Sequence, residues 1–201
     1  MGIGRLLLVR HGESEGNRAR RYTPHPEVPL TDVGRGQAAR AADLLARRYA
    51  PRLIVSSPFL RARQTAHIVA EALELPLSIE PDLRERNYGA LAGQPYETPR
   101  SGYDPAAYWT WRPAEGESLV EVLERTGAAL DRIARAAGVD EAIVVSHGAV
   151  MLALWRHVTG AWAEPRVVPN AGVIEVEHRD GSYVAARHIG EETDGRSTWR
   201  R

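Results

Sequence analysis

Two histidines of this chain each follow a short apolar run and precede a glycine. His11 comes shortly after the apolar residues 6–9, and His147 comes shortly after the apolar residues 142–145. If both runs are strands of an open α/β sheet, their carboxyl ends face the crevice in which such sheets bind ligands. The shared setting indicates that His11 and His147 belong to one site.

Two arginines occupy comparable positions. Arg10 directly precedes the first histidine, and Arg61 lies at the start of a helical stretch that follows a predicted strand at 53–56. A guanidinium donates two parallel hydrogen bonds to one phosphate or carboxylate, so this edge of the sheet suits an anion. Gly12 and Gly148 would let the backbone approach that anion closely, and a helix that starts after the second histidine would add free amide groups.

Composition narrows the function. The 201 residues are 43% hydrophobic and 26% charged, as expected for one globular domain with a sizeable core. All 26 basic residues are arginines, which excludes a Schiff-base lysine and a Walker-type phosphate loop. The absence of cysteine excludes a thiolate nucleophile and cysteine-ligated zinc. Acidic and basic residues balance at 26 each and the apolar runs are too short to span a bilayer, so we expect a cytoplasmic protein without a nucleic-acid or membrane partner.

Short apolar runs alternate with amphipathic stretches, which is typical of a sheet covered by helices. We expect strands at 6–9, 53–56, 77–80, 142–145, 172–177 and 183–188, and helices at about 31–49, 59–73, 118 to a stop at Gly138, and 149–159. Residues 12–30 and 82–112 are rich in proline and glycine and should form long loops, the first without a helix and the second with a short helix near 105–111. Residues 1–190 then form a single domain, and residues 191–201 a flexible tail.

Five blocks of the sequence occur in the order found in one enzyme family. They are Arg10-His11-Gly12-Glu13-Ser14 with Asn17, residues 56–66, residues 83–89, Gly116-Glu117-Ser118 and Ser146-His147-Gly148. In these blocks the chain resembles the histidine phosphatase superfamily, in particular its cofactor-dependent phosphoglycerate mutase branch. The resemblance implies an α/β fold, a phosphoglycerate mutase-like three-layer α/β/α sandwich with a mostly parallel, mixed central sheet. It also implies a reaction without a metal or an organic cofactor.

The resemblance further implies roles for individual residues. His11 would be the nucleophile that forms a phosphohistidine, and Glu85 would be the proton donor. The residues that would bind the phosphate or lie at its rim are Arg10, Asn17, Arg61, Tyr88, His147 and Gly148.

These roles suit the chemistry of phosphoryl transfer. The transition state spreads negative charge over the equatorial oxygens, so catalysis depends on positioning and on positive charge. The cations Arg10 and Arg61 would also lower the pKa of His11 and keep its nucleophilic nitrogen unprotonated. Glu85 must carry a proton to the leaving alkoxide, so we expect the activity to fall as the pH rises above neutrality.

The segment after Gly89 bears on the type of reaction. The mutases that the chain resembles carry a long basic insertion there, whereas the 27 residues at 90–116 of this chain contain Arg100 and Arg112 as the only cations. This difference favours hydrolysis of a small phosphomonoester over phosphoglycerate mutase-type transfer, because a mutase must protect its phosphohistidine from water. A non-catalytic protein that binds a phosphate ligand is a further alternative.

Aromatic residues are frequent in the same segment, namely Tyr96, Tyr103, Tyr108, Trp109 and Trp111. We expect most of them to pack the segment against the core, while some form the floor of a substrate pocket. The sequence does not identify the substrate, which we expect to be a small phosphorylated metabolite, and it leaves open whether the protein is a monomer or a homodimer.

Three patterns point to other chemistry. Residues 12–16 match the G-x-S-x-G elbow of serine hydrolases, with Ser14 as nucleophile and His147 as base, but prolines at 24, 26 and 29 argue against the helix that must follow. Residues 34–39 imitate a dinucleotide fingerprint inside a predicted helix rather than after a strand. The 7 histidines lack zinc-binding spacing and the nearby cations would repel a divalent ion, so we expect no metal site.

Overall fold

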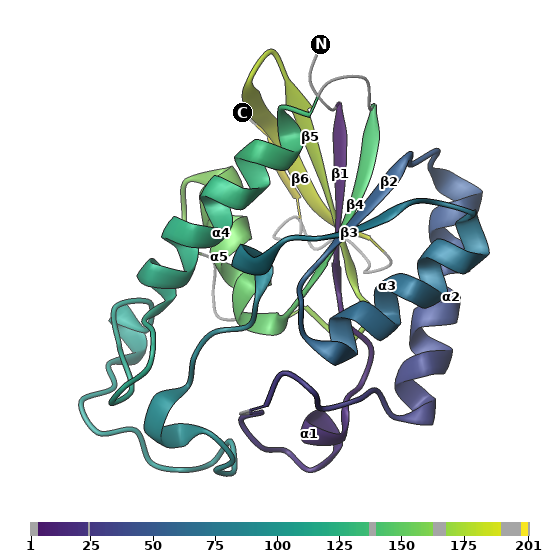
Figure 1. Cartoon of the computed structure of the whole chain (residues 1–201). Helices are drawn as coiled ribbons and strands as arrows, with labels where there is room; N and C mark the ends of the chain where they lie inside the picture. Colours follow the sequence, from purple (N-terminus) through teal and green to yellow (C-terminus); the bar gives the residue numbers. More distant parts are fainter. Residues whose placement is uncertain (1–3, 24, 137–139, 163–167, 190–197, 201) are drawn as a thin grey trace.

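A mixed sheet forms the centre of the molecule. The structure, a computed structural model, describes residues 4–23, 25–136, 140–162, 168–189 and 198–200. The strands are β1 (Arg5–Arg10), β2 (Leu53–Ser56), β3 (Leu77–Ile79), β4 (Glu141–Ser146), β5 (Val173–Arg179), β6 (Ser182–Ile189) and β7 (Thr198–Arg200). Their order across the sheet is β3-β2-β4-β1-β5-β6-β7 (Figure 1). The strands from β3 to β1 in this order pair in parallel, and β5, β6 and β7 continue the sheet with antiparallel pairing.

Helices cover both faces of the sheet, which confirms the expected three-layer α/β/α sandwich (Figure 1). The α-helices are α1 (Glu15–Arg18), α2 (Asp32–Arg48), α3 (Leu60–Leu73), α4 (Leu119–Ala134) and α5 (Gly148–Thr159). The helices α2 and α3 pack together on one face, and α4 and α5 pack together on the other. Short 3-10 helices lie between β3 and α4, namely η1 (Pro81–Leu83), η2 (Gly89–Leu91) and η3 (Pro105–Ala107).

Strand β1 shows why the parallel strands are continuous apolar runs. Leu6 and Leu8 belong to the core that includes residues of α4 and α5, whereas Leu7 and Val9 belong to the core that includes residues of α2 and α3. All four side chains are fully buried. A strand with helices on both faces needs an apolar side chain at every position.

The predicted starts of the long helices are confirmed by their caps. The side chain of Thr31 accepts a hydrogen bond at the first turn of α2, and Ser118 and Glu121 form the expected capping box at α4. Helix α5 begins directly after His147. Helix α4 ends at Ala134, and its expected stop at Gly138 lies outside the described residues.

Two expectations about irregular segments are wrong. Residues 15–18 form α1 inside a predicted loop, because Ser14 and Asn17 cap the helix reciprocally and the prolines come only after it. Residues 198–200 form β7 and pair with β6, where a flexible tail was expected. The pairing satisfies backbone groups that the edge of β6 would otherwise expose. The rest of the expected tail lies outside the described residues.

The strand order places three carboxyl ends side by side. Strand β4 lies between β1 and β2, with Ser146 paired with Arg10 and Val145 paired with Ser56. The residues that directly follow these strands therefore meet at one edge of the sheet, as the sequence predicted.

The loop after β1 touches the first turn of α2 at two glycines. A Cβ atom at Gly12 would lie 2.3 Å from the carbonyl oxygen of Gly34, and a Cβ atom at Gly34 would lie 2.0 Å from the carbonyl oxygen of Glu13. Both distances are far below van der Waals contact, so only glycine permits this approach of the two backbones. Residues 34–39 imitate a dinucleotide fingerprint, and this packing explains structurally why the first residue of that segment is a glycine.

We expect Gly34→Ala to destabilise the protein by about 1–3 kcal/mol, because the added methyl group meets backbone rather than a movable side chain. Gly36→Ala in the same helix is the matched control, since the added Cβ would lie 3.5 Å from Nη1 at the tip of the flexible Arg40 side chain. This variant should gain about 0.8 kcal/mol of helix propensity. Urea denaturation measures both changes, and a Gly34→Ala protein as stable as Gly36→Ala would refute the close backbone contact.

Candidate active site

A cavity of about 520 Å³ opens at the edge where β1, β4 and β2 end. His147 does not line it, but its ring packs against the ring of His11 with the centroids 5.1 Å apart. The structure therefore brings the residues predicted from sequence to one place. Those that line the cavity are Arg10, His11, Asn17, Arg61, Glu85, Tyr88 and Gly148.

The hydrogen bonds of His11 assign the proton on its ring. The ring is buried, and its Nδ1 lies 2.6 Å from the carbonyl oxygen of Gly12, which accepts, so Nδ1 donates. Its Nε2 lies 3.3 Å from Nε of Arg61, which is a donor, so Nε2 accepts. The lone pair of His11 is therefore on Nε2, next to the guanidinium of Arg61.

The backbone around His11 is held by other segments of the fold. The amide of His11 donates to the carbonyl oxygen of Ser146 at 2.9 Å. Its carbonyl oxygen accepts from Nδ2 of Asn170 at 3.1 Å. The amide of Gly12 donates to Oγ1 of Thr65 at 3.1 Å. Strand β4, helix α3 and the segment before β5 thus fix the position of the imidazole.

Burial and charge together keep His11 neutral. Burial lowers the pKa of His11 well below its ordinary value, and the cations Arg61 and Arg10 lower it further. The effect of the two arginines was predicted from the sequence, whereas the larger effect of burial depends on the folded structure. The imidazole is therefore neutral at neutral pH, with one proton on Nδ1 and none on Nε2.

His147 is a second buried imidazole in contact with the first. Its Nε2 lies 2.7 Å from Oγ of Ser57, the residue that follows β2. Its Nδ1 is buried and has no hydrogen-bond partner among the described residues. Burial, and then the charge of Arg61, lower the pKa of His147. A buried ring nitrogen without a hydrogen-bond partner costs free energy in the folded protein.

Arg61 brings a buried positive charge to the cavity, and Arg10 brings a half-buried one. Arg61 is only 2% exposed, and its Nη1 lies 3.5 Å from the carbonyl oxygen of His25. Arg10 donates to the carbonyl oxygen of Val168 at 2.7 Å. Neither forms an ion pair with any residue that the structure describes. Because buried charges are normally paired, two unpaired guanidinium groups mark a site for an anion.

Among the described residues, Glu85 is the one carboxyl group that lines the cavity. Burial raises the pKa of Glu85, while the charge of Arg61 and a hydrogen bond from the amide of Arg86 oppose the shift. The raised pKa allows Glu85 to hold a proton to higher pH than an exposed glutamate. The acid and the unprotonated base that the sequence predicted thus lie in one cavity.

Aromatic side chains form much of the cavity wall. The expectation that most of the aromatic group packs the segment against the core is confirmed for Tyr103, Tyr108 and Trp109, which pack together with Leu119 and Ala149. Trp109 does pack as expected, since it stacks on Trp162 with the centroids 5.8 Å apart. Arg100 holds part of the wall, because its guanidinium lies over the ring of Tyr103 at 4.3 Å. The members that line the cavity are Tyr96, Tyr103, Tyr108 and Trp111.

The geometry does not support the serine-hydrolase reading. Ser14 is fully buried, and its hydroxyl lies 3.1 Å from Oδ1 of Asn17. His147 contacts Ser57 instead of Ser14, so the required pair of nucleophile and base does not form. Within the described part of the chain, no group of three or more His, Cys, Asp or Glu side chains is arranged to hold a metal ion.

Several residues that hold or line the site were not identified as such from the sequence. Asn170 binds both the backbone of His11 and, at 3.1 Å, the side chain of Asn17. No local pattern marks this asparagine. Ser57 lies inside one of the five blocks, and its position after a strand could have indicated its role. Further residues of the cavity wall are Tyr22, Thr23, Arg86 and Arg100.

Comparison with known proteins agrees with this geometry. The family model of the histidine phosphatase superfamily (branch 1) matches residues 6–189. The chain is 34% identical over 191 residues to a metal-independent phosphoserine phosphatase of Arabidopsis thaliana. The alignment covers 90% of this chain and 79% of that protein. It is 32% identical over 177 residues to phosphoglycerate mutase-like protein 4 of the same plant. This alignment covers 84% of this chain and 76% of that protein.

Solved structures show the same fold. Mycobacterial hydrolase 1 superposes with a TM-score of 0.82 at 26% identity, covering 92% of this chain and 96% of that one. A mycobacterial glucosyl-3-phosphoglycerate phosphatase in complex with VO3 superposes with a TM-score of 0.79 at 27% identity, covering 87% and 92%. The chain belongs to the histidine phosphatase superfamily.

Among the described residues, no helix combines the length and the apolar composition needed to cross a membrane. The cytoplasmic location stays a prediction.

Proposed function

We propose that this protein is a metal-independent phosphomonoesterase that acts through a phosphohistidine at Nε2 of His11. The observation that carries the proposal is a buried, neutral imidazole whose Nε2 holds the lone pair and lies 3.3 Å from Nε of Arg61. A cation that binds the phosphate next to the nucleophile holds the two reactants together before the reaction begins.

In the first step, Nε2 of His11 attacks the phosphorus and the bond from phosphorus to the ester oxygen breaks. Arg10 and Arg61 bind the non-bridging oxygens and stabilise the charge that develops on them. Glu85 donates its proton to the leaving oxygen, so the alcohol departs without charge. Burial favours this role, because it raises the pKa of Glu85.

In the second step, a water molecule attacks the phosphorus of the phosphohistidine. Glu85 accepts a proton from this water, and the bond between nitrogen and phosphorus breaks with its electron pair returning to Nε2 of His11. Inorganic phosphate leaves, and both residues regain their starting protonation states. The cycle needs no group beyond the side chains of the cavity and water.

We propose a small phosphorylated metabolite as the substrate. The cavity of about 520 Å³ falls within the usual range for small ligands, about 300–1,000 Å³. The aromatic wall around Tyr103 and Trp111 would contact the leaving group. Relatives named for phosphoserine and for glucosyl-3-phosphoglycerate support esters of this class.

Phosphoglycerate mutase-type transfer is the second candidate, which the similarity to phosphoglycerate mutase-like protein 4 favours. Of the two cations in segment 90–116, only Arg100 lines the cavity, whereas Arg112 binds Glu121 and the backbone of Gly116. The scarcity of basic groups in segment 90–116 favours hydrolysis over mutase-type transfer. With a phosphoglycerate as substrate, a phosphatase releases inorganic phosphate and a mutase forms the positional isomer.

We expect His11→Ala to lower the hydrolysis of p-nitrophenyl phosphate at least about 1,000-fold, because the nucleophile is lost. The wild-type activity should persist in a chelator, and mass spectrometry of quenched turnover should find the phosphoryl group on the peptide that contains His11. Ser14→Ala with an aryl ester tests the serine-hydrolase alternative. Chelator-sensitive activity, or activity that survives in His11→Ala, would exclude the proposed mechanism.

We expect Glu85→Gln to lose the fall in kcat/KM at high pH. In the wild type a protonated Glu85 is required, and its pKa is raised, so the rate declines only as the pH rises through that value. Glutamine does not titrate and donates no proton, so the variant should be slow at every pH. The loss should be about 100-fold or more for an alkyl phosphate and much smaller for p-nitrophenyl phosphate, whose leaving group needs no proton. Equal losses for both esters would count against Glu85 as the acid.

A further inference from the structure

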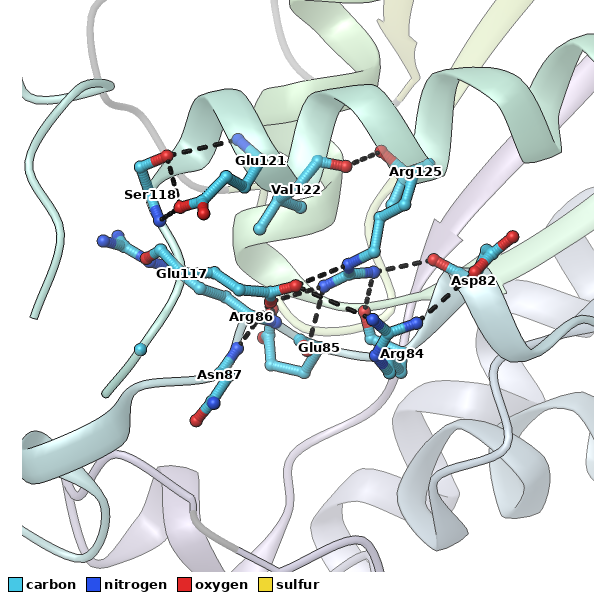
Figure 2. Close-up of polar contacts among 12 residues, drawn as sticks. Asp82, Arg84, Glu85, Arg86, Asn87, Glu117, Ser118, Glu121, Val122 and Arg125 are labelled. Atoms are coloured by element: carbon cyan, nitrogen blue, oxygen red, sulfur yellow. Dashed lines mark hydrogen bonds and ion pairs between the residues drawn. The ribbon is translucent and has the colours of Figure 1, made fainter. Parts of the chain in front are cut away.

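Arg125 lies on α4 and does not line the cavity, yet it binds the backbone that carries Glu85. Its Nη1 donates to the carbonyl oxygens of Asp82 and Arg84, at 2.7 and 2.8 Å. Its Nη2 donates to the carbonyl oxygen of Glu85 at 3.2 Å. Figure 2 shows the guanidinium between these carbonyl groups and the side chain of Glu117.

Glu117 completes this arrangement. Its carboxylate accepts from Nε and Nη2 of Arg125, both at 2.9 Å, and from the amide of Asn87 at 2.8 Å. Its carbonyl oxygen accepts from Nε of Arg86 at 2.7 Å. Arg125 and Glu117 together thus bind each residue from 84 to 87 (Figure 2).

No regular secondary structure fixes the position of Glu85. Residues 84–88 belong to no helix or strand. Within the described part of the chain, the carboxyl group of Glu85 accepts a hydrogen bond only from its own segment, from the amide of Arg86 at 2.9 Å. The contacts with Arg125 and Glu117 therefore fix the position of Glu85, as the hydrogen bonds of a helix or a strand would otherwise do.

The pair of Arg125 and Glu117 is largely buried, with side chains 11% and 18% exposed. Burial by itself raises the pKa of Glu117, but hydrogen bonds from Arg125 and from the amide of Asn87 outweigh it and hold the pKa below the ordinary value. The carboxylate is therefore ionised and bound at both oxygens. Two parallel bonds to a guanidinium give this contact a fixed geometry.

We propose that Arg125 and Glu117 are positioning residues that place the carboxyl group of Glu85 for proton transfer to the leaving group. This inference rests on the proposed function, because it gives Glu85 the role of acid. A displacement of about 1 Å from the productive geometry can lower a rate about 100-fold. The pair acts through the backbone of Arg84, Glu85 and Asn87 and through the side chain of Arg86, and neither member of the pair lines the cavity.

Arg132 offers a matched control on the same helix. Its side chain is 51% exposed and binds the carboxylates of Glu80 and Asp82, each at 3.0 Å. Its polar partners among the described residues do not include residues 84–87. A general loss of an arginine from α4 should affect both positions alike, whereas a positioning role belongs to Arg125 alone.

The test compares kcat/KM of Arg125→Met and Arg132→Met with p-nitrophenyl phosphate and with an alkyl phosphate such as glycerol phosphate. Both esters form the same phosphohistidine, so their ratio isolates the departure of the leaving group. We expect Arg125→Met to lose about 10- to 100-fold on the alkyl ester and less than about 3-fold on the aryl ester. Arg132→Met should keep the wild-type ratio.

A thermal melt shows whether each variant is folded, and Glu117→Gln provides a second route if Arg125→Met does not fold. Arg125→Lys should restore only part of the ratio, because an ammonium group lacks the planar fork. In the double variant with Glu85→Gln, Arg125→Met should cause no further selective loss. Equal losses on both esters, or a folded variant with the wild-type ratio, would overturn the positioning role. If Glu85→Gln itself shows no selectivity for the alkyl ester, the proposed function fails instead.

Discussion

The site depends on the imidazole of His11, which is kept neutral although it lies next to guanidinium groups. Burial lowers the pKa of His11, and the charges of Arg61 and Arg10 add to this effect. The hydrogen bond from Nδ1 to the carbonyl oxygen of Gly12 leaves the lone pair on Nε2. The arrangement exists because β4 lies between β1 and β2, which brings three strand ends together. The order of the strands, rather than any single motif, therefore creates the nucleophile.

A buried cation, Arg61, and a half-buried one, Arg10, lack ion pairs with the described residues, and this costs free energy in the folded protein. Apolar cores on both faces of the sheet stabilise strand β1, which carries Arg10, and helix α3, which carries Arg61. A phosphate dianion would neutralise Arg10 and Arg61. The charges that keep His11 reactive are thus the same charges that bind the ester it attacks.

The local sequence was sufficient to predict those elements and site residues that adjacent residues indicate. An apolar run precedes His11, and a capping box precedes α4, so both were predicted. It was insufficient where the partner is distant, since Asn170 binds the backbone of His11 across 159 positions. Residues 198–200 are too few to show a strand period, and their pairing depends on the free edge of β6. Burial, the main cause of the low pKa of His11, likewise follows from tertiary packing.

The protonation state of His11 in the free enzyme tests the central claim most directly. In ¹H–¹⁵N NMR spectra of the labelled protein, the signals that disappear in His11→Ala belong to this ring. We predict a neutral ring at neutral pH, with its proton on Nδ1, that remains neutral as the pH falls below the ordinary value of 6.5. A His11 ring that is doubly protonated at neutral pH, or that carries its one proton on Nε2, would contradict the account.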